Sequence, residues 1–286
     1  MTLSICICTK GRPAILERCL HSVFAGKALP TAVLVSDDGE DSDAMRKVQA
    51  SFPGVLFLKG PRRGLCANRN HVIRHVCTDY VSLVDDDAVL GNTFVSGVID
   101  MLPRLPAKVV VTGDLIEDDI LLSPSNPSFW GYFAEPPTVR NETIHLNSNV
   151  FPSKAFSSVS FDENIAYGYE DMDVCSQLLA LGYEIRHEPG LVNYHVPPAT
   201  NFPVPKSREL QRERARFYTS VRRYFIWEKK WVKGCAYLLL APLHRIGHAL
   251  KMRDPADIPH CVADTVFALR GLISLKGTAL RPSIQG

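Results

Sequence analysis

The chain has 286 residues, 46% of them hydrophobic and 22% charged, and its formal net charge is +2. A chain of this length can bury one large core or two closely joined lobes, and its composition is ordinary for a globular enzyme. The near-neutral charge and the lack of a recognisable nucleic-acid-binding motif in the sequence exclude a general nucleic-acid binder, so we expect no nucleic-acid partner.

Strand-like and helix-like segments alternate over the first 115 residues. Short, β-rich apolar runs predict strands at residues 3–9, 32–35, 55–58, 80–84 and 109–112. Helical spacing and helix-start residues predict helices at residues 13–24, 43–52, 64–76 and 94–102. Because short loops join these segments in alternation, we predict an α/β fold with a doubly wound, mostly parallel sheet flanked by helices.

The alternation stops between residues 116 and 145, where prolines and aromatic residues predict a long irregular segment. Long loops inside compact domains are usually functional. Regular structure is predicted again at residues 147–156, as a helix at residues 170–181 that Gly182 ends, and as a strand pair at residues 184–196.

The composition changes after Pro205. Residues 206–253 carry thirteen Lys and Arg against three acids, a net charge of +10, which leaves −8 for the rest of the chain. Aromatic residues are interleaved with these basic residues, and this combination suits an interfacial helix on an anionic membrane. We therefore predict a helical extension that contacts such a membrane. The alternative is a helical bundle with a solvated basic face, packed on the preceding lobe.

The eight cysteines include no Cys-x-x-Cys pair and no zinc-ligand spacing, so we expect reduced thiols and a cytosolic protein. Cys6 and Cys8 lie two apart in a predicted strand and should share one buried face. No signal-peptide pattern is present, and the longest apolar run is far below the roughly 20 residues of a membrane span. We expect a cytoplasmic protein, peripheral on the cytoplasmic face of a membrane.

Polar clusters follow three of the predicted strands, at residues 9–12, 37–38 and 85–87. Ligands of such sheets bind beyond the carboxyl ends of the strands, so the three clusters predict one site. In the third cluster, Asp85 and Asp87 should point to one side of an extended segment and Asp86 to the other.

Two carboxylates on one side suit a hard divalent cation shared with a diphosphate, whose charge the cation neutralises. The alternative for Asp85–Asp87 is a solvated acidic turn or a helix N-cap. Three adjacent aspartates after a buried strand are costly unless something binds them, so we favour the cation site.

Asp37 and Asp38 suit contacts to a nucleobase or a ribose hydroxyl, or simply a turn before Gly39. Arg69 lies in a helix that Gly64 opens. It suits a phosphate near the helix N-terminus or an ion pair with the aspartates, and the alternative is a surface arginine.

Glu170 and Asp171 begin a helix, where acids are favoured as capping residues. The functional interpretation is a general base that takes a proton from an acceptor hydroxyl. Asp173 lies two residues on, faces away from Asp171, and is interpreted as structural. His195 ends a predicted strand and is either a metal ligand or a structural histidine.

Taken in order, these segments resemble the family 2 glycosyltransferases, which are inverting enzymes of the GT-A fold. The resemblance runs from about residue 3 to residue 195. It rests on the ordered set Thr9-Lys10-Gly11-Arg12, Asp37-Asp38-Gly39, Ala67-Asn68-Arg69-Asn70, Leu83-Val84-Asp85-Asp86-Asp87, Phe161-Asp162-Glu163 and Gly168-Tyr169-Glu170-Asp171-Met172-Asp173. One departure is Gln177, at a position where the family commonly has an arginine.

The resemblance implies a role for each part of the site. Asp171 would be the catalytic base, and Asp87, with Asp85 and His195, would hold Mn²⁺ or Mg²⁺. The donor would be a UDP-sugar, with its base on Asp38 or Asp37, and the acceptor a hydroxyl of a glycan or of a lipid-linked molecule. The implied donor-binding residues are Thr9, Arg12, Asp37, Asp38, Arg69, Asp85, Asp86 and Glu170.

On this basis residues 1–115 form the nucleotide-sugar-binding half of a GT-A domain, residues 116–204 the acceptor-binding and catalytic half, and residues 205–286 a basic helical extension. A sugar nucleotidyltransferase is one alternative, but the segment after the first strand is too short for its Gly-rich loop. A non-catalytic, membrane-associated adaptor on the same fold is another, and the complete set of acidic residues argues against it.

Overall fold

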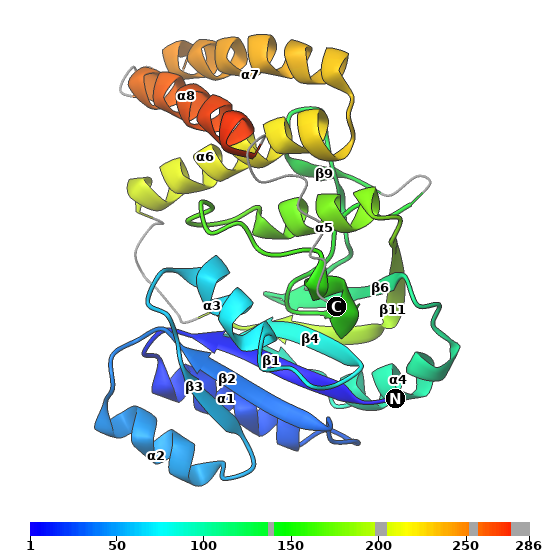
Figure 1. The fold of residues 1–286 in the computed structure, drawn as a ribbon. Coiled ribbons are helices and arrows are strands. Elements are labelled where there is room, and N and C mark those ends of the chain that lie inside the picture. Colours follow the sequence, from blue (N-terminus) through cyan, green and yellow to red (C-terminus); the bar gives the residue numbers. More distant parts are fainter. Residues whose placement is uncertain (137–139, 198–204, 252–256, 276–286) are drawn as a thin grey trace, which may run out of the picture.

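A computed structural model describes residues 1–136, 140–197, 205–251 and 257–275. Its main sheet has nine strands in the order β3-β2-β1-β4-β10-β6-β11-β5, and β7 pairs with β6 (Figure 1). The strands of this sheet are β1 (Leu3–Thr9), β2 (Ala32–Asp37), β3 (Leu56–Lys59), β4 (Tyr80–Asp85), β5 (Ala88–Leu90), β6 (Val109–Glu117), β7 (Ile120–Leu122), β10 (Asn149–Pro152) and β11 (Glu184–His195). A separate small sheet joins β8 (Asn126–Pro127) to β9 (Phe133–Glu135).

The first four strands are parallel, which places their carboxyl ends at one edge. β10 runs antiparallel to both β4 and β6, whereas β11 is parallel to β6 and antiparallel to β5. The predicted α/β class is therefore confirmed. The predicted strand pair at residues 184–196 is wrong, because this segment is one strand whose register shifts between His187 and Val192.

Helices cover both faces of the sheet. Alternate side chains of β1 point to opposite faces and pack in the two cores that these helices form with the sheet. Ile5 and Ile7 pack with α1 (Pro13–Phe24), α2 (Asp43–Ser51) and α4 (Phe94–Met101). Cys6 and Cys8 face the other way, as predicted, and pack with α3 (Leu65–Ile73) and α5 (Glu170–Ala180). Two short 3₁₀ helices, η1 (Leu102–Arg104) and η2 (Ser153–Ser157), complete this part.

The C-terminal helices form a layer over α5. They are α6 (Lys206–Arg222), continued by a π-helical turn η3 (Arg223–Trp227), α7 (Trp231–Lys251) and α8 (Asp257–Leu275). Figure 1 shows α6 lying between α5 and the pair formed by α7 and α8. Among the described residues, no helix is long and apolar enough to cross a membrane.

The predicted basic and aromatic outer face of residues 206–253 is wrong for the second half of α6 and the turn that follows it, whereas the basic residues of the first half of α6 are exposed. Arg216, Arg222 and Arg223 are only 4–7% exposed, and they make ion pairs inside the protein. The aromatic residues of this stretch that are also buried are Phe217, Tyr218, Tyr224 and Tyr237. This part matches the alternative of a helical bundle packed on the preceding lobe; Arg253 lies outside the described residues.

The segment predicted to be irregular at residues 116–145 instead contains the short strands β7, β8 and β9, and its residues 127–132 contact these helices. Arg223 donates to the carbonyl oxygen of Pro127 at 3.2 Å, and the hydroxyl of Tyr224 donates to that of Phe129 at 2.8 Å. The Arg216 guanidinium lies 4.1 Å from the centre of the Tyr132 ring. The C-terminal helices therefore determine where much of this segment lies.

Candidate functional site

The carboxyl ends of β1, β2 and β4 bring the three predicted polar clusters together. Thr9 lies beside Asp37 in the register of β1 and β2, and Cys8 lies beside Asp85 in that of β1 and β4. Neighbouring parallel strands end side by side, so residues far apart in the chain line one edge. We call this the donor edge.

Asp86 is the most buried residue of the aspartate run, and its carboxylate is fully used. Both oxygens accept hydrogen bonds from Arg12, and one also accepts from the Thr9 hydroxyl at 2.5 Å. Burial raises the pKa of Asp86 to about 6. Because Thr9 and Asp86 are 3% and 0% exposed, the geometry favours a positioning role for them over the direct donor contact implied by the resemblance. Arg12, which is partly exposed, also reaches Asp87 at 3.4 Å.

Arg69 is buried and joins the donor edge to α5, which excludes a surface arginine. Its guanidinium donates to Asp85 at 2.7 Å and to Glu170 at 2.6 Å, and it lies 5.5 Å from the centre of the Phe161 ring. The interpretation of Arg69 as a partner of the aspartates therefore fits the structure. This ion pair also directs the Asp85 carboxylate towards Arg69.

Two carboxylates at the start of α5 are incompletely satisfied. The Oε2 atom of Glu170 is buried and has no hydrogen-bond partner in the part of the chain that the structure describes. Asp171 is partly exposed, and its Oδ1 atom accepts from the Met172 amide at 2.8 Å. Desolvation of its carboxyl group, together with the neighbouring charge of Glu170, raises the pKa of Asp171 to about 7. A carboxyl group with this pKa can exchange a proton near neutral pH.

The backbone just before these acids is strained. Tyr169 has a φ of +62°, which non-glycine residues rarely adopt, and it follows Gly168 at +75°. The Tyr169 ring stacks on Phe133 of β9 at 5.0 Å, and Arg212 of α6 lies 5.9 Å from the Tyr169 ring centre. Surrounding contacts thus hold a strained turn at the point where Glu170 and Asp171 enter the site, as is common at functional sites.

Asp87 and His195 are the described residues best placed to share a metal ion. Asp87 Oδ1 and His195 Nε2 are 3.6 Å apart, a spacing that fits two ligand atoms each about 2.1 Å from one ion. The other ring nitrogen of His195 lies 3.1 Å from Glu117, which would orient the imidazole.

The predicted trio of Asp85, Asp87 and His195 does not form. No group of three or more His, Cys, Asp or Glu suited to a metal is found within residues 1–136, 140–197, 205–251 and 257–275. The ion pair with Arg69 accounts for the loss of Asp85 from the trio. A cation on Asp87 and His195 would therefore need further oxygen ligands from a bound diphosphate or from water.

Asp37 and Asp38 differ in how much of each carboxylate is used. Asp38 is buried, and its two oxygens accept from the amides of Arg62 and Gly64, so it shapes the turn into α3. Asp37 is partly exposed, and Oδ1 accepts from two amides, those of Gly11 and Gly39, at 2.8 Å. Asp37 is therefore the better placed of the two for a ligand.

The side of α5 away from the donor edge is held by an arginine of α6. Arg222 donates to Asp173 at 2.8 Å and lies 3.1 Å from Asp162. Asp173 also accepts from Gln177 at 2.8 Å and from the Trp227 indole at 3.4 Å. The structural interpretation of Asp173 fits this network. Gln177, which stands where an arginine is common, is part of the same network behind the site.

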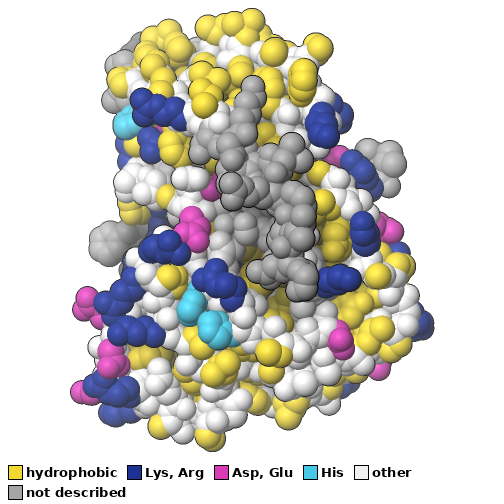
Figure 2. Space-filling model, viewed as in Figure 1, with side chains coloured by type: hydrophobic (Ala, Val, Ile, Leu, Met, Phe, Trp, Pro, Cys, Tyr) yellow, Lys and Arg dark blue, Asp and Glu magenta, His cyan; other side chains and the backbone are white. Residues whose placement is uncertain are grey.

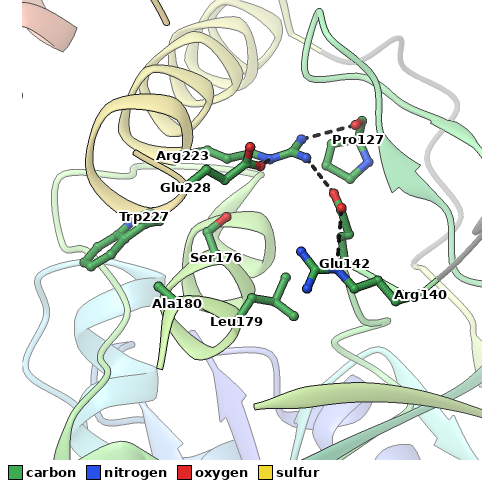
Figure 3. Close-up of a pocket in the computed structure, with 9 residues that line it drawn as sticks. All are labelled: Pro127, Arg140, Glu142, Ser176, Leu179, Ala180, Arg223, Trp227 and Glu228. Atoms are coloured by element: carbon green, nitrogen blue, oxygen red, sulfur yellow. Dashed lines mark hydrogen bonds and ion pairs between the residues drawn. The ribbon is translucent and has the colours of Figure 1, made fainter. Parts of the chain in front are cut away.

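A small pocket lies near the other end of α5, as Figure 3 shows. Ser176, Leu179 and Ala180 form its α5 wall. Arg223 extends across it and pairs with Glu142 and with Glu228. Because Glu170 and Asp171 lie at the opposite end of α5, this pocket is separate from the donor edge, and its charged groups are paired with one another.

Two of the contributors described above were not expected from sequence. Glu117 ends β6, and its pairing with His195 depends on the parallel contact of β6 with β11. Arg222 was expected to be an exposed basic residue of the tail. No local sequence pattern marks either residue, because each acts through a partner that only the fold brings near.

Comparisons with known proteins agree with this architecture. The family model described as glycosyl transferase family 2 matches residues 4–163, more than half of the chain, and no curated protein matches the sequence. Among solved structures, GalNAc-T7 with UDP, GalNAc and Mn²⁺ is similar with a TM-score of 0.63 and 12% identity, over 79% of this chain and 48% of that one. The chain thus spans about half the length of that protein.

A second similar structure is the mannosyltransferase PcManGT from Pyrobaculum calidifontis with GDP-Man and Mn²⁺. It matches with a TM-score of 0.57 and 15% identity, over 93% of this chain and 86% of that one. At these identities the two structures establish the fold, and the family match adds the class of enzyme. The chain belongs to glycosyl transferase family 2 and is a glycosyltransferase with the GT-A fold.

Proposed function

We propose that this enzyme transfers a sugar, with inversion, from a nucleotide diphosphate sugar to a hydroxyl group of a glycan or lipid-linked acceptor. The observation that carries the proposal is the start of α5, where Asp171 has a pKa raised to about 7 beside Glu170, whose Oε2 has no partner among the described residues. A purely structural pair of acids would have its buried oxygens satisfied. Here Glu170 Oε2 can accept a hydrogen bond from a ligand, and the raised pKa of Asp171 suits proton transfer near neutral pH.

Asp171 is the general base of the proposed reaction. The acceptor oxygen attacks the anomeric carbon and forms the new glycosidic bond, while its proton passes to a carboxylate oxygen of Asp171. The bond from the anomeric carbon to the diphosphate oxygen breaks, and its electron pair leaves with the diphosphate. A single carboxylate suffices for this displacement, which inverts the configuration at the anomeric carbon.

Asp87 and His195 would hold a divalent cation, Mn²⁺ or Mg²⁺, and Glu117 orients the His195 ring. When bound, such a cation supplies Lewis-acid stabilisation of the departing diphosphate. Arg12 lies 3.4 Å from Asp87 and adds positive charge at the same edge.

The other residues of the donor edge bind or position the donor. Asp37 accepts a hydrogen bond from the nucleobase, because the carboxylate of Asp38 already holds the turn at Arg62 and Gly64. Glu170 Oε2 accepts from a hydroxyl of the donor sugar. Asp85 lies near the ribose, kept in place by Arg69.

Uridine is the first candidate for the base, as the family resemblance implies. GalNAc-T7 was solved with UDP and PcManGT with GDP-Man, so the two similar structures support a nucleotide donor and Mn²⁺ while differing in the base. A carboxylate such as Asp37 can accept from either uracil or guanine, and experiment must distinguish them.

The test is thermal unfolding with UDP, GDP, dTDP or CMP, each with Mn²⁺ or with a chelator. A ligand that binds only the folded state raises the melting temperature. We expect a rise with UDP that requires Mn²⁺, that is lost in Asp87→Ala, and that is kept in the matched surface variant Asp100→Ala. A rise with another nucleotide would change the donor class. No rise with any nucleotide would favour a non-catalytic adaptor on this fold.

A further inference from the structure

The outward faces of α7 and α8 carry two apolar stripes. On α7, Val232, Leu239 and Leu243 are 88%, 66% and 58% exposed, and their spacing of seven and four residues places them on one side of the helix. On α8, Val262 and Val266 follow the same rule. Figure 2 shows hydrophobic side chains gathered over the end of the molecule where Figure 1 places α7 and α8.

The two stripes lie on neighbouring helices, and we call the two together the outer face. The helices are packed against each other, and Arg245 of α7 pairs with the buried Asp264 of α8 at 2.7 Å. On α7 the stripe runs on to Leu250, about 27 Å from its start at the rise of a helix. On α8 it reaches Ile273, which is 72% exposed. A solvent-exposed apolar surface of this extent usually marks an interaction site.

The exposed charged side chains that the structure describes on α7 and α8 are basic. α7 contains no Asp or Glu, and Asp264, the one acid among the described side chains of α8, is buried between Arg214 and Arg245. Lys229 and Lys251, just before and at the end of α7, are exposed, and so is Arg270 on α8. Two copies of this face would bring like charges together, whereas an anionic lipid surface would complement them.

We propose that the outer face of α7 and α8 docks the enzyme on an anionic lipid bilayer, with the aliphatic stripes inserted at the level of the headgroups. Both helices lie in the plane of the interface, since neither is long and apolar enough to cross. The contact is made by leucines, valines and isoleucines, and the two buried arginines of α6, Arg216 and Arg222, take no part in it. Binding to the bilayer does not involve the sugar donor, so it can be measured without any nucleotide.

The experiment measures binding of the whole protein to vesicles by flotation. The vesicles are phosphatidylcholine alone or phosphatidylcholine mixed with phosphatidylserine. The test variant is Leu239→Glu with Leu243→Glu. Its matched control is Ile120→Glu with Leu121→Glu, which alters two aliphatic residues of similar exposure on β7. Circular dichroism establishes that each variant is folded.

We expect the wild type and the β7 control to bind the mixed vesicles about tenfold or more tightly than phosphatidylcholine alone, since each basic residue near the surface contributes about 1 kcal/mol. The α7 variant should lose binding by about a hundredfold. Three results overturn the proposal: no binding by the folded wild type, equal binding to both vesicles, or equal loss in both variants. A dimer of the wild type that the α7 variant abolishes, without vesicle binding, would assign the face to a second copy instead.

Discussion

Acidic residues on the two sides of α5 differ in how completely their charges are compensated. On the side of α6, Asp173 receives hydrogen bonds from Arg222, Gln177 and Trp227, and its charge is balanced. On the donor edge, two residues earlier, Asp171 has a raised pKa, and one oxygen of the neighbouring Glu170 has no partner in the part of the chain that the structure describes. The difference teaches that complete compensation marks the residues that hold the fold, whereas incomplete compensation marks the residues left for a ligand.

The largest expected effect comes from removing the unbalanced acid. Asp171→Asn keeps the size of the side chain but cannot take the acceptor proton, so we expect transfer to fall by about 10²–10⁴-fold. Nucleotide binding should stay within about twofold of the wild type, because Asp171 is not assigned to the donor. The measurements are turnover and nucleotide affinity by calorimetry, with Asp100→Asn as the control. Near-normal turnover in Asp171→Asn would remove the base assignment.

Removing the balancing arginine tests the other side of α5. Arg222→Ala leaves Asp173 and Asp162 with an uncompensated buried charge, and breaking such a pair costs about 3–5 kcal/mol. We expect a correspondingly lower free energy of unfolding in urea, with little change in Arg208→Ala, an exposed arginine on the same helix. If both variants unfold alike, the pair with Asp173 contributes no more than a surface contact.

The pH dependence of turnover sharpens the assignment of Asp171. Its pKa of about 7 means that the carboxylate needed as a base is lost as the pH falls through neutrality. We expect turnover to fall about tenfold for each pH unit below about 6.5 and to level off above about 7.5. The measurement is turnover at saturating donor from about pH 5 to about pH 8.5. A profile that stays flat down to pH 5 would mean that another group accepts the proton.

The smallest expected effect is on stability, and its sign follows from the same pKa. The folded state holds the Asp171 proton up to about pH 7, whereas an unfolded aspartate releases it near its ordinary value, so this group makes the protein less stable as the pH rises between the two. Asp171→Asn removes that loss. We expect its melting temperature to exceed that of the wild type at pH 8 and to match it at pH 4.

The positions of the site residues that follow parallel strands could be predicted from the sequence. Parallel strands end at one edge, so Asp37 and Asp85 could be placed together without a structure. The burial of a side chain could not be predicted where it depends on a partner far away in the sequence. The burial of Arg69 depends on Glu170, 101 residues away, and the net charge of the tail said nothing about which way Arg222 points.

The metal site shows the same limit. The alternation of Asp85, Asp86 and Asp87 along the chain predicted a shared cation between the first and third, and Asp86 does turn into the protein. Asp85, however, forms an ion pair with Arg69, so Asp87 and His195 remain as the two residues that could hold a cation. A spacing rule places side chains on a face and does not decide which of them find partners.

The pair formed by Asp173 and Arg222 has a consequence for how this enzyme can change over time. The two residues come from different parts of the chain. Loss of Arg222 would leave the buried charge of Asp173 uncompensated, whereas Arg222 without Asp173 would keep Asp162 as a partner. A substitution at position 222 should therefore be tolerated only together with one at position 173, and Gln177 should vary with them. Among relatives that carry an arginine at position 177, we expect position 222 to be released from this requirement, which would let their C-terminal tails diverge.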